Sequence, residues 1–302
     1  MNTSAENKIP DFFIVGAAKS GTTSLWYYLK ENDSVYVPGD ELVKEPKFFS
    51  DLAKREKMTF KRYLKLFSGA YPGQVIGEAS TAYLTDPSAS KNIYEFNPEA
   101  KIIIILRNPA DRAYSLYNWM VQEGYEYLNT FEKALEAGNR RKSKRIPNFW
   151  EPEYYWNYRY FASGLYSRQV ERYLKLFPTL ILKFEDLVAN SRQVYNEVCA
   201  FLEAEPTSLS PKILNDSKLV HSSYITFALR KLNNIKEVVD GHLLGEKESK
   251  KERDSLVRLT QISAKPPKLD PDLRKRLLKK YEPDINRLCK LTGKDFYTWL
   301  DE

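Results

Sequence analysis

A loop of small residues, placed between a short apolar segment and a helical pattern, is the first place where this chain could do chemistry. In the stretch FIVGAAKSGTTSL, residues 13–25, Gly16 and Gly21 have the Gly-x4-Gly spacing of a phosphate-binding loop. Such a loop directs backbone N–H groups and the positive end of a helix dipole at one point. Thr22 and Thr23 add hydroxyl donors in the first helical turn, so the pattern predicts an anion site.

The position of the lysine distinguishes this loop from that of a nucleotide triphosphatase. There, a lysine directly after the second glycine reaches the β- and γ-phosphates, and the next Ser or Thr holds magnesium. Here Thr22 takes that position, and the central apolar run ends in Leu106 and Arg107 rather than in a metal-binding aspartate. Lys19 lies inside the loop, which suits a shorter anion whose bridging oxygen is neutralised without a metal. The alternative to a metal-free site of this kind is the nucleotide site of a P-loop kinase.

A second anion element follows the next predicted strand, in IIIILRNPADRAYSLY, residues 102–117. Pro109 suits the first position of a helix, which leaves Arg107 at the carboxyl edge of the sheet. Ser115 lies about a turn and a half into that helix, so its hydroxyl and the guanidinium can meet one phosphate. Because ligands of open α/β sheets bind at the carboxyl ends of the strands, the two elements are predicted to hold one ligand.

These two motifs resemble the donor site of sulfotransferases that use 3′-phosphoadenosine 5′-phosphosulfate (PAPS). GAAKSGTTSL is similar to the family's 5′-phosphosulfate loop, and the Arg-x7-Ser spacing of Arg107 and Ser115 is similar to its 3′-phosphate site. The resemblance implies PAPS as co-substrate, 3′-phosphoadenosine 5′-phosphate (PAP) as product, and no metal. The donor-binding residues it implies are Lys19, Ser20, Gly21, Thr22, Thr23, Ser24, Arg107 and Ser115, with Tyr166 as a candidate contact of the adenine.

Transfer of a sulfuryl group to a hydroxyl or an amine needs a base for the acceptor's proton, an in-line path and a cation at the leaving phosphate. Lys19 can supply the cation. His221 and His242, the only two histidines, do not lie in a segment like the catalytic-histidine segment of cytosolic sulfotransferases. VKEPKFFSD, residues 43–51, instead resembles a segment of heparan sulfate and bacterial sulfotransferases in which a glutamate before Phe-Phe is the base. The resemblance therefore implies Glu45 as base, whereas a lone glutamate would be a solvated surface charge.

Further segments extend the resemblance over about residues 10–301: GEASTAYL, LILKFEDL and the C-terminal LLKKYEPDINRLCKLTGKDFYTWL. One position departs from it, because Ala79 stands where the family often has a lysine near the acceptor, and this departure argues against a polyanionic sugar as the acceptor. Lys44 or Lys47 could compensate for that missing cation.

The order of apolar and amphipathic segments predicts an α/β fold, with a P-loop-like parallel sheet flanked by helices and a helical C-terminal cap. From Leu187 onward the patterns indicate helices and no strand. A single domain is expected over residues 10–302, after a flexible tail of residues 1–9. The predicted strands are residues 12–15, 35–37, 75–76, 101–106 and 180–184.

Composition narrows the class of protein. Of 302 residues, 42% are hydrophobic and 29% charged, which is ordinary for a globular protein. No run approaches the length of a membrane span, and the polar start lacks the apolar core of a signal peptide, so a cytoplasmic protein is expected. The two cysteines, Cys199 and Cys289, are expected to be small buried residues. The net charge of +7 favours an anionic ligand over a nucleic acid, because basic residues occur throughout the chain.

The acceptor is left open among small molecules, lipids and glycans, and the oligomeric state is not predicted. The aromatic segment 146–166 could bind any of these acceptors or be a packed flap. The basic run 140–145 is either a solvated loop or a surface that attracts an anion, and residues 215–224 could close over the nucleotide. Besides the kinase, a non-catalytic nucleotide or nucleic-acid-binding protein is a further alternative.

Overall fold

The structure is a computed structural model that describes residues 8–39, 44–52, 58–141, 155–208, 219–240, 257, 260–262, 264 and 266–301. The chain divides into two compact units. The sheet unit comprises Met1–Asn108, Leu165–Leu214 and Glu282–Glu302, and the helical unit comprises Pro109–Gly164 and Asn215–Tyr281. The expectation of one domain over residues 10–302 stays a prediction.

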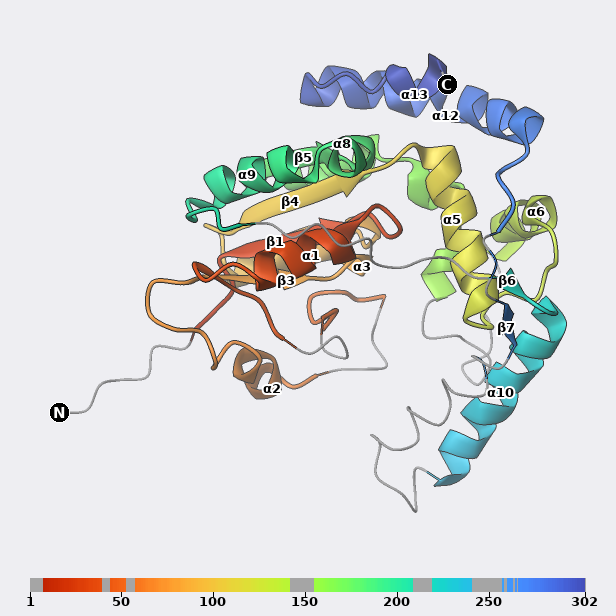
Figure 1. The fold of residues 1–302 in the computed structure, drawn as a ribbon, viewed down its shortest axis with the longest axis horizontal. Coiled ribbons are helices and arrows are strands. Elements are labelled where there is room, and N and C mark those ends of the chain that lie inside the picture. The colour runs from red at the N-terminus through yellow and green to blue at the C-terminus, as the bar shows by residue number, and fades with distance from the viewer. Residues whose placement is uncertain are drawn as a thin grey trace. The chain divides into compact units, whose positions relative to one another are not determined.

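Five parallel strands form the sheet unit, in the order β2-β3-β1-β4-β5 (Figure 1). Phe12 of β1 pairs with Gly77 of β3 on one side and with Lys101 of β4 on the other. The run KIIIIL of β4 is apolar on both sides because helices cover both faces of a central parallel strand. The strands are β1 (Phe12–Gly16), β2 (Val35–Tyr36), β3 (Val75–Ala79), β4 (Lys101–Leu106) and β5 (Thr179–Lys183).

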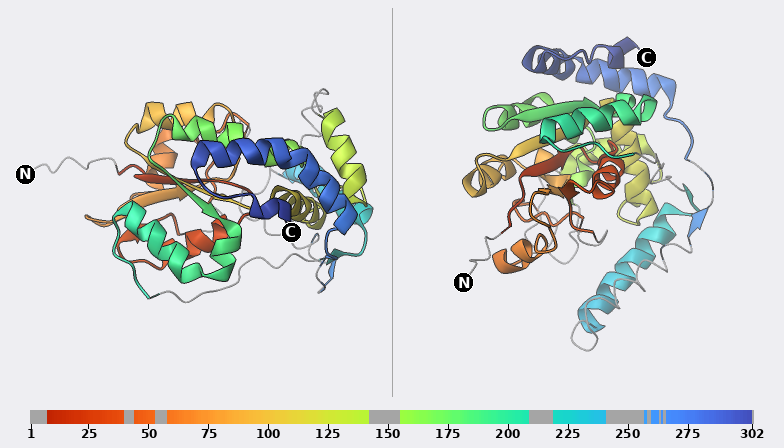
Figure 2. Two further views of the ribbon diagram at one scale, coloured as in Figure 1. Left: turned by 90° about the horizontal axis from the view of Figure 1, so that it is seen from above. Right: turned by 60° about the vertical axis from the view of Figure 1, so that its left-hand side comes forward.

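Helices α1 and α9 cover one face of this sheet, and α4 and α7 lie on the other, as the left view of Figure 2 shows. The C-terminal helix α12 reaches the sheet unit from Glu282 onward, so the predicted C-terminal helix is present. The helices of the sheet unit are α1 (Thr22–Lys30), α2 (Phe60–Lys65), α3 (Ala82–Thr85), α4 (Ala89–Phe96), α7 (Ser167–Leu174), α8 (Phe184–Ala189), α9 (Ser191–Leu202), the end of α12 (Pro271–Thr292) and α13 (Thr298–Asp301).

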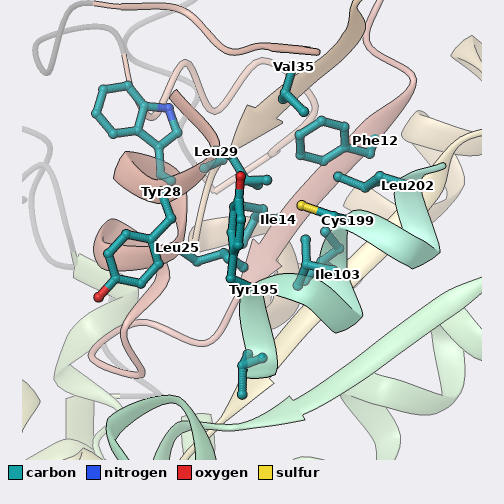
Figure 3. Packing of buried hydrophobic residues seen from close by; sticks show 14 of the residues in the cluster. Phe12, Ile14, Leu25, Tyr28, Leu29, Val35, Ile103, Tyr195, Cys199 and Leu202 are labelled. Carbon is teal, nitrogen blue, oxygen red and sulfur yellow. The ribbon is translucent and has the colours of Figure 1, made fainter. Parts of the chain in front are cut away.

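The core between α1, α9 and the sheet is a cluster of buried apolar side chains (Figure 3). Phe12 and Ile14 point into it from β1, while Phe13, between them, meets Phe49 edge to face on the other side, with ring centroids 5.7 Å apart. This alternation is the two-residue period of a strand. Cys199 of α9 lies in the cluster as a free, buried thiol, and Cys289 is also free and buried, as predicted.

The helical unit contains a short antiparallel pair, β6 (Leu219–Val220) with β7 (Gln261–Ile262). The sequence analysis indicated no strand after residue 187 and was wrong here, because two-residue strands are too short to show an alternating pattern. The remaining elements are α5 (Pro109–Gln122), α6 (Phe131–Arg141), the 3-10 helices η3 (Tyr155–Tyr158) and η4 (Ala162–Gly164), α10 (Ser223–Asp240) and the start of α12.

A buried carboxylate organises part of the helical unit. Glu126 is fully buried and accepts two hydrogen bonds from the Arg141 guanidinium, at 2.6 and 3.0 Å, and one from the Tyr160 hydroxyl at 2.9 Å. Arg141 therefore has a structural role within the basic run 140–145, of which 142–145 lie outside the described residues. In the parts of the chain that the structure describes, no helix combines the length and apolarity needed to cross a membrane.

Candidate active site

The loop between β1 and α1 is fixed by backbone contacts at the carboxyl edge of the sheet. The Ala17 N–H donates to the Ile105 carbonyl of β4 at 2.7 Å, and the Ser20 N–H donates to the Ala17 carbonyl at 3.2 Å. Gly21 has φ 83°, a left-handed conformation that favours glycine. A Cβ at Gly21 would also lie 2.9 Å from Cδ2 of Leu187, so the position requires glycine for packing as well.

This loop has the features of an anion cradle. Helix α1 begins at Thr22 with Gly21 as N-cap, without a side-chain cap and without an acidic residue in its first turn. The N–H groups of a first helical turn have no acceptor within the helix, so they are available to an anion. Ser20 is fully buried, and its Oγ has no hydrogen-bond partner among the residues that the structure describes. A buried hydroxyl without a partner is costly, so a ligand oxygen is the natural partner of Ser20.

Arg107 lies beside this loop, as predicted from the end of β4. Its Nη1 donates to the Lys19 carbonyl at 3.2 Å, and its guanidinium lies over the Phe184 ring, 4.6 Å from the centroid. Tyr166 is fully buried, and its hydroxyl donates to the Arg107 carbonyl at 2.9 Å. Tyr166 therefore anchors the end of β4, and its contact with adenine stays a prediction.

Ser115 lies in α5, half-buried, in the helical unit. Its convergence with Arg107 on one phosphate stays a prediction. A neighbouring residue of α5, Asp111, accepts two hydrogen bonds from Arg274 within the same unit, at 3.0 and 3.1 Å.

Glu45 lies close to the anion loop, on a turn of residues 44–50 that we call the base turn. Its carboxylate accepts a hydrogen bond from Thr81 Oγ1, with distances of 3.2 and 3.1 Å to its two oxygens. The buried ammonium of Lys44 lies 4.0 Å from Glu45 Oε1 and donates to Thr23 Oγ1 at 2.6 Å. Lys44 thus connects the predicted base with the first turn of α1.

The base turn is held by the segment that follows β3. The Lys47 N–H donates to Ser80 Oγ at 3.0 Å, and the Phe49 N–H donates to the Tyr83 hydroxyl at 3.3 Å. Phe48 stacks on Tyr63 with ring centroids 4.4 Å apart. The Phe-Phe pair of the motif therefore anchors the turn in the protein.

Ala79, which stands where the family often has a lysine, is buried in the core cluster on β3. Of the two lysines considered as replacements, Lys44 has its ammonium 4.0 Å from the Glu45 carboxylate. The sequence analysis missed the roles of Thr81 and of the buried carboxyl of Glu78. Both lie in the segment GEASTAYL, which was recognised only for its resemblance. Two polar residues at the end of a predicted parallel strand were a signal that could have identified them.

Part of the aromatic segment packs inside the helical unit. The Tyr158 hydroxyl donates to the Tyr125 carbonyl, and Tyr160 contacts Glu126 as described above. Residues 146–154, residues 215–218 and His242 lie outside the described residues, and Val220 and His221 belong to or follow β6. The contacts of Tyr158 and Tyr160 therefore support the packed-flap interpretation for this part of the segment.

The helical unit also holds a cavity of about 610 Å³. Tyr114, Phe131 and Pro267 supply apolar surface, and Asn118, His221 and Asp270 supply polar groups. Its volume lies in the range that small-molecule ligands fill.

Comparison with known proteins identifies the family. The chain matches the family model described as "Sulfotransferase domain" over residues 9–292, and it belongs to this family. A crystal structure of a sulfotransferase from Alicyclobacillus acidocaldarius superposes with a TM-score of 0.67 and 28% identity, covering 97% of this chain and 99% of that one. The predicted family and the predicted fold are confirmed.

Several curated relatives are named as heparan sulfate sulfotransferases. Heparan sulfate glucosamine 3-O-sulfotransferase 5 of Mus musculus is 30% identical over 171 residues, 57% of this chain and 46% of that protein. Bifunctional heparan sulfate N-deacetylase/N-sulfotransferase 1 of Caenorhabditis elegans is 25% identical over 310 aligned residues, 98% of this chain and 32% of that protein. The chain thus spans less than half the length of these two relatives.

Proposed function

We propose that this protein transfers a sulfuryl group from PAPS to a hydroxyl or amine of an acceptor, with Glu45 as base and without a metal. The observation that carries the proposal is that a predicted anion site and a predicted base lie next to each other. The anion loop and the Glu45 carboxylate are linked through one buried side chain, Lys44, whose ammonium contacts Thr23 and faces Glu45. Family membership supports the same chemistry.

The residues of the loop fit the donor's 5′ end. Backbone N–H groups of Gly21 to Ser24 and the hydroxyls of Ser20 and Thr22 would hold the phosphosulfate, and Lys19 would neutralise charge on the bridging oxygen. Arg107, with Ser115, would hold the 3′-phosphate. PAPS supplies an activated sulfuryl group, whose bond to the phosphate oxygen breaks as the acceptor oxygen or nitrogen bonds to sulfur.

Glu45 would take the proton that the acceptor loses. Thr81 donates to its carboxylate and fixes its orientation, which a general base needs in order to face one acceptor proton. Lys44 places a positive charge 4.0 Å from the Glu45 carboxylate. Its buried ammonium is the cation that the sequence lacks at Ala79, and it favours a negatively charged acceptor.

The acceptor class is proposed from chemistry and from relatives. The chain carries a net charge of +7, and two relatives have names that specify heparan sulfate as their substrate. We therefore place glycans with free hydroxyl or amino groups first, before lipids and small molecules. The cavity beside Tyr114 is a candidate site for an apolar or ring-shaped part of an acceptor.

The test is calorimetric binding of PAP, 5′-AMP and ATP in the absence of magnesium. We expect PAP to bind at least tenfold more tightly than 5′-AMP, because only PAP has the 3′-phosphate that Arg107 would meet. Arg107→Ala should remove that preference, and the matched variant Arg62→Ala, at an exposed position of α2, should keep it. Equal affinity for PAP and 5′-AMP in the unaltered protein would contradict the proposal, and magnesium-dependent turnover of ATP would favour the kinase.

A further inference from the structure

Glu78 is a buried carboxyl that the proposed mechanism does not use. It lies on β3, 1% exposed, next to the strand end that meets the base turn. We propose that Glu78 is a positioning residue, which orients Glu45 by holding the base turn through Ser80 and the backbone of Lys47. This inference rests on the proposed function, in which Glu45 is the base.

The contacts form one continuous chain. The Tyr63 hydroxyl donates to Glu78 Oε2, the Ser80 hydroxyl donates to Glu78 Oε1 at 2.8 Å, and the Lys47 N–H donates to Ser80 Oγ at 3.0 Å. An ionised carboxylate can only accept hydrogen bonds. It therefore keeps the Ser80 hydroxyl turned toward itself as a donor, which leaves a lone pair of Ser80 directed to the Lys47 N–H.

The backbone of Lys47, which donates to Ser80, has a conformation that depends on such contacts. Lys47 has φ 52°, a left-handed conformation that non-glycine residues rarely adopt, and it stands two residues after Glu45. Surrounding contacts must hold a residue in that region. The Ser80 contact holds Lys47 at its amide, so a change at Ser80 alters the backbone two residues from Glu45.

A second contact joins the same two segments. Thr81, the neighbour of Ser80, donates to the Glu45 carboxylate. Residues 78–81 therefore touch the base turn both at its backbone and at its functional group. Moving the end of β3 would alter both contacts together, which explains why the carboxyl that fixes Ser80 affects the base.

Glu78 changes between its protonated and ionised forms close to neutral pH. Burial raises its pKa to about 7, although hydrogen bonds from Tyr63, Tyr83 and Ser80 oppose the shift, and the charge of Glu45 adds to it. The groups that face Glu78 are thus two tyrosines from α2 and α3, one serine and the Glu45 carboxylate, with the Lys44 ammonium beyond it. Protonation would turn one acceptor oxygen into a donor and weaken the hold on Ser80.

The experiment is a double-mutant cycle of Glu78→Gln and Ser80→Ala in the full chain, read by hydrogen exchange of the Lys47 amide. Gln mimics the protonated carboxyl, and Ala breaks the link itself. We expect each single variant to speed exchange at least tenfold at pH 8, and Glu78→Gln to add nothing to Ser80→Ala. Asp11→Asn is the matched control, because Asp11 accepts from the Ile76 N–H at the opposite end of β3. It should leave exchange at Lys47 unchanged.

A second measurement separates positioning from mere stability. PAP release from PAPS, with water as acceptor, should increase as pH rises through about 7 in the unaltered protein and lose that step in Glu78→Gln. Unchanged Lys47 exchange, or additive effects of the two substitutions, would overturn this inference even if Glu78→Gln turned over slowly. Failure of the proposed function would appear separately, as the absence of PAP preference in the calorimetry.

Discussion

The anion loop and the base turn meet at the same edge of the sheet but are built in different ways. In the loop, the local sequence supplies the glycine for the left-handed turn at Gly21 and the start of the helix at Thr22, while one backbone hydrogen bond from Ala17 ties the loop to β4. The base turn, with Lys47 in a left-handed conformation, is held by Ser80 and Tyr83, which follow β3. A site can therefore combine a half whose glycine and helix start are visible in a short stretch of sequence with a half whose contacts come from a distant segment.

Removing the base should have the largest effect. We expect Glu45→Gln to reduce turnover of PAPS by about 10³- to 10⁴-fold, the upper range for a positioned general base, and to change PAP affinity by less than about twofold. The comparison predicts this separation because Glu45 belongs to the base turn and not to the anion loop. Steady-state kinetics and calorimetry on the same preparation would measure both quantities. A Glu45→Gln protein with ordinary turnover would remove Glu45 from the mechanism.

Removing the lysine of the loop should be nearly as severe. Lys19→Ala is expected to lower turnover about 10²- to 10³-fold, the usual result of deleting one group that stabilises charge in a transition state. Lys30→Ala is the matched control, because Lys30 ends the same helix and its ammonium binds the Gly39 carbonyl at 2.7 Å. If both variants lost turnover equally, general charge rather than the place of Lys19 would be responsible.

The buried carboxyl behind the base turn predicts a pH dependence of stability. Its pKa is raised from 4.5 to about 7 in the folded protein, so the folded state binds this proton more tightly than the unfolded state. The contribution of Glu78 to stability is thus fully present below about pH 4.5 and is lost as pH rises to about 7, by about 3 kcal/mol.

Urea unfolding at pH 5 and pH 8 would measure most of this loss, which Glu78→Gln should abolish. Glu95→Gln should retain it, because Glu95 is an exposed residue of α4 paired with Lys91 at 3.4 Å. A pH dependence that is the same in the Glu78→Gln protein would show that Glu78 titrates alike in both states.

The smallest effect tests whether the loop is truly local. Gly21→Ala should reduce the free energy of unfolding by about 2 kcal/mol, through its positive φ and the close approach of Leu187. Gly73→Ala has the same conformational cost at φ 87°, but nothing lies within 4 Å of a Cβ there, so about 1 kcal/mol is expected. Urea unfolding of both variants would measure the two losses, and their difference is the cost of the contact with Leu187. Equal losses would mean that backbone conformation alone requires Gly21.

Sequence reasoning was most successful where a few adjacent residues decide the structure. It placed β1, the loop and α1 closely, and it identified β4 with Arg107 at its end. It placed β3 as residues 75–76, although the strand continues to Ala79, because Gly77 and the buried Glu78 interrupt the apolar pattern. That interruption concealed the segment that holds the base turn.

The sequence by itself determined the family, the parallel sheet and the anion loop, because apolar runs, glycine spacing and helix starts are local properties of the chain. Only the tertiary structure decided that Thr81 meets Glu45, 36 residues away, and that Lys44 meets Thr23. The physical reason is that these pairs depend on the register of β1 and β3 and on how the base turn packs against the sheet, which no short stretch of residues specifies.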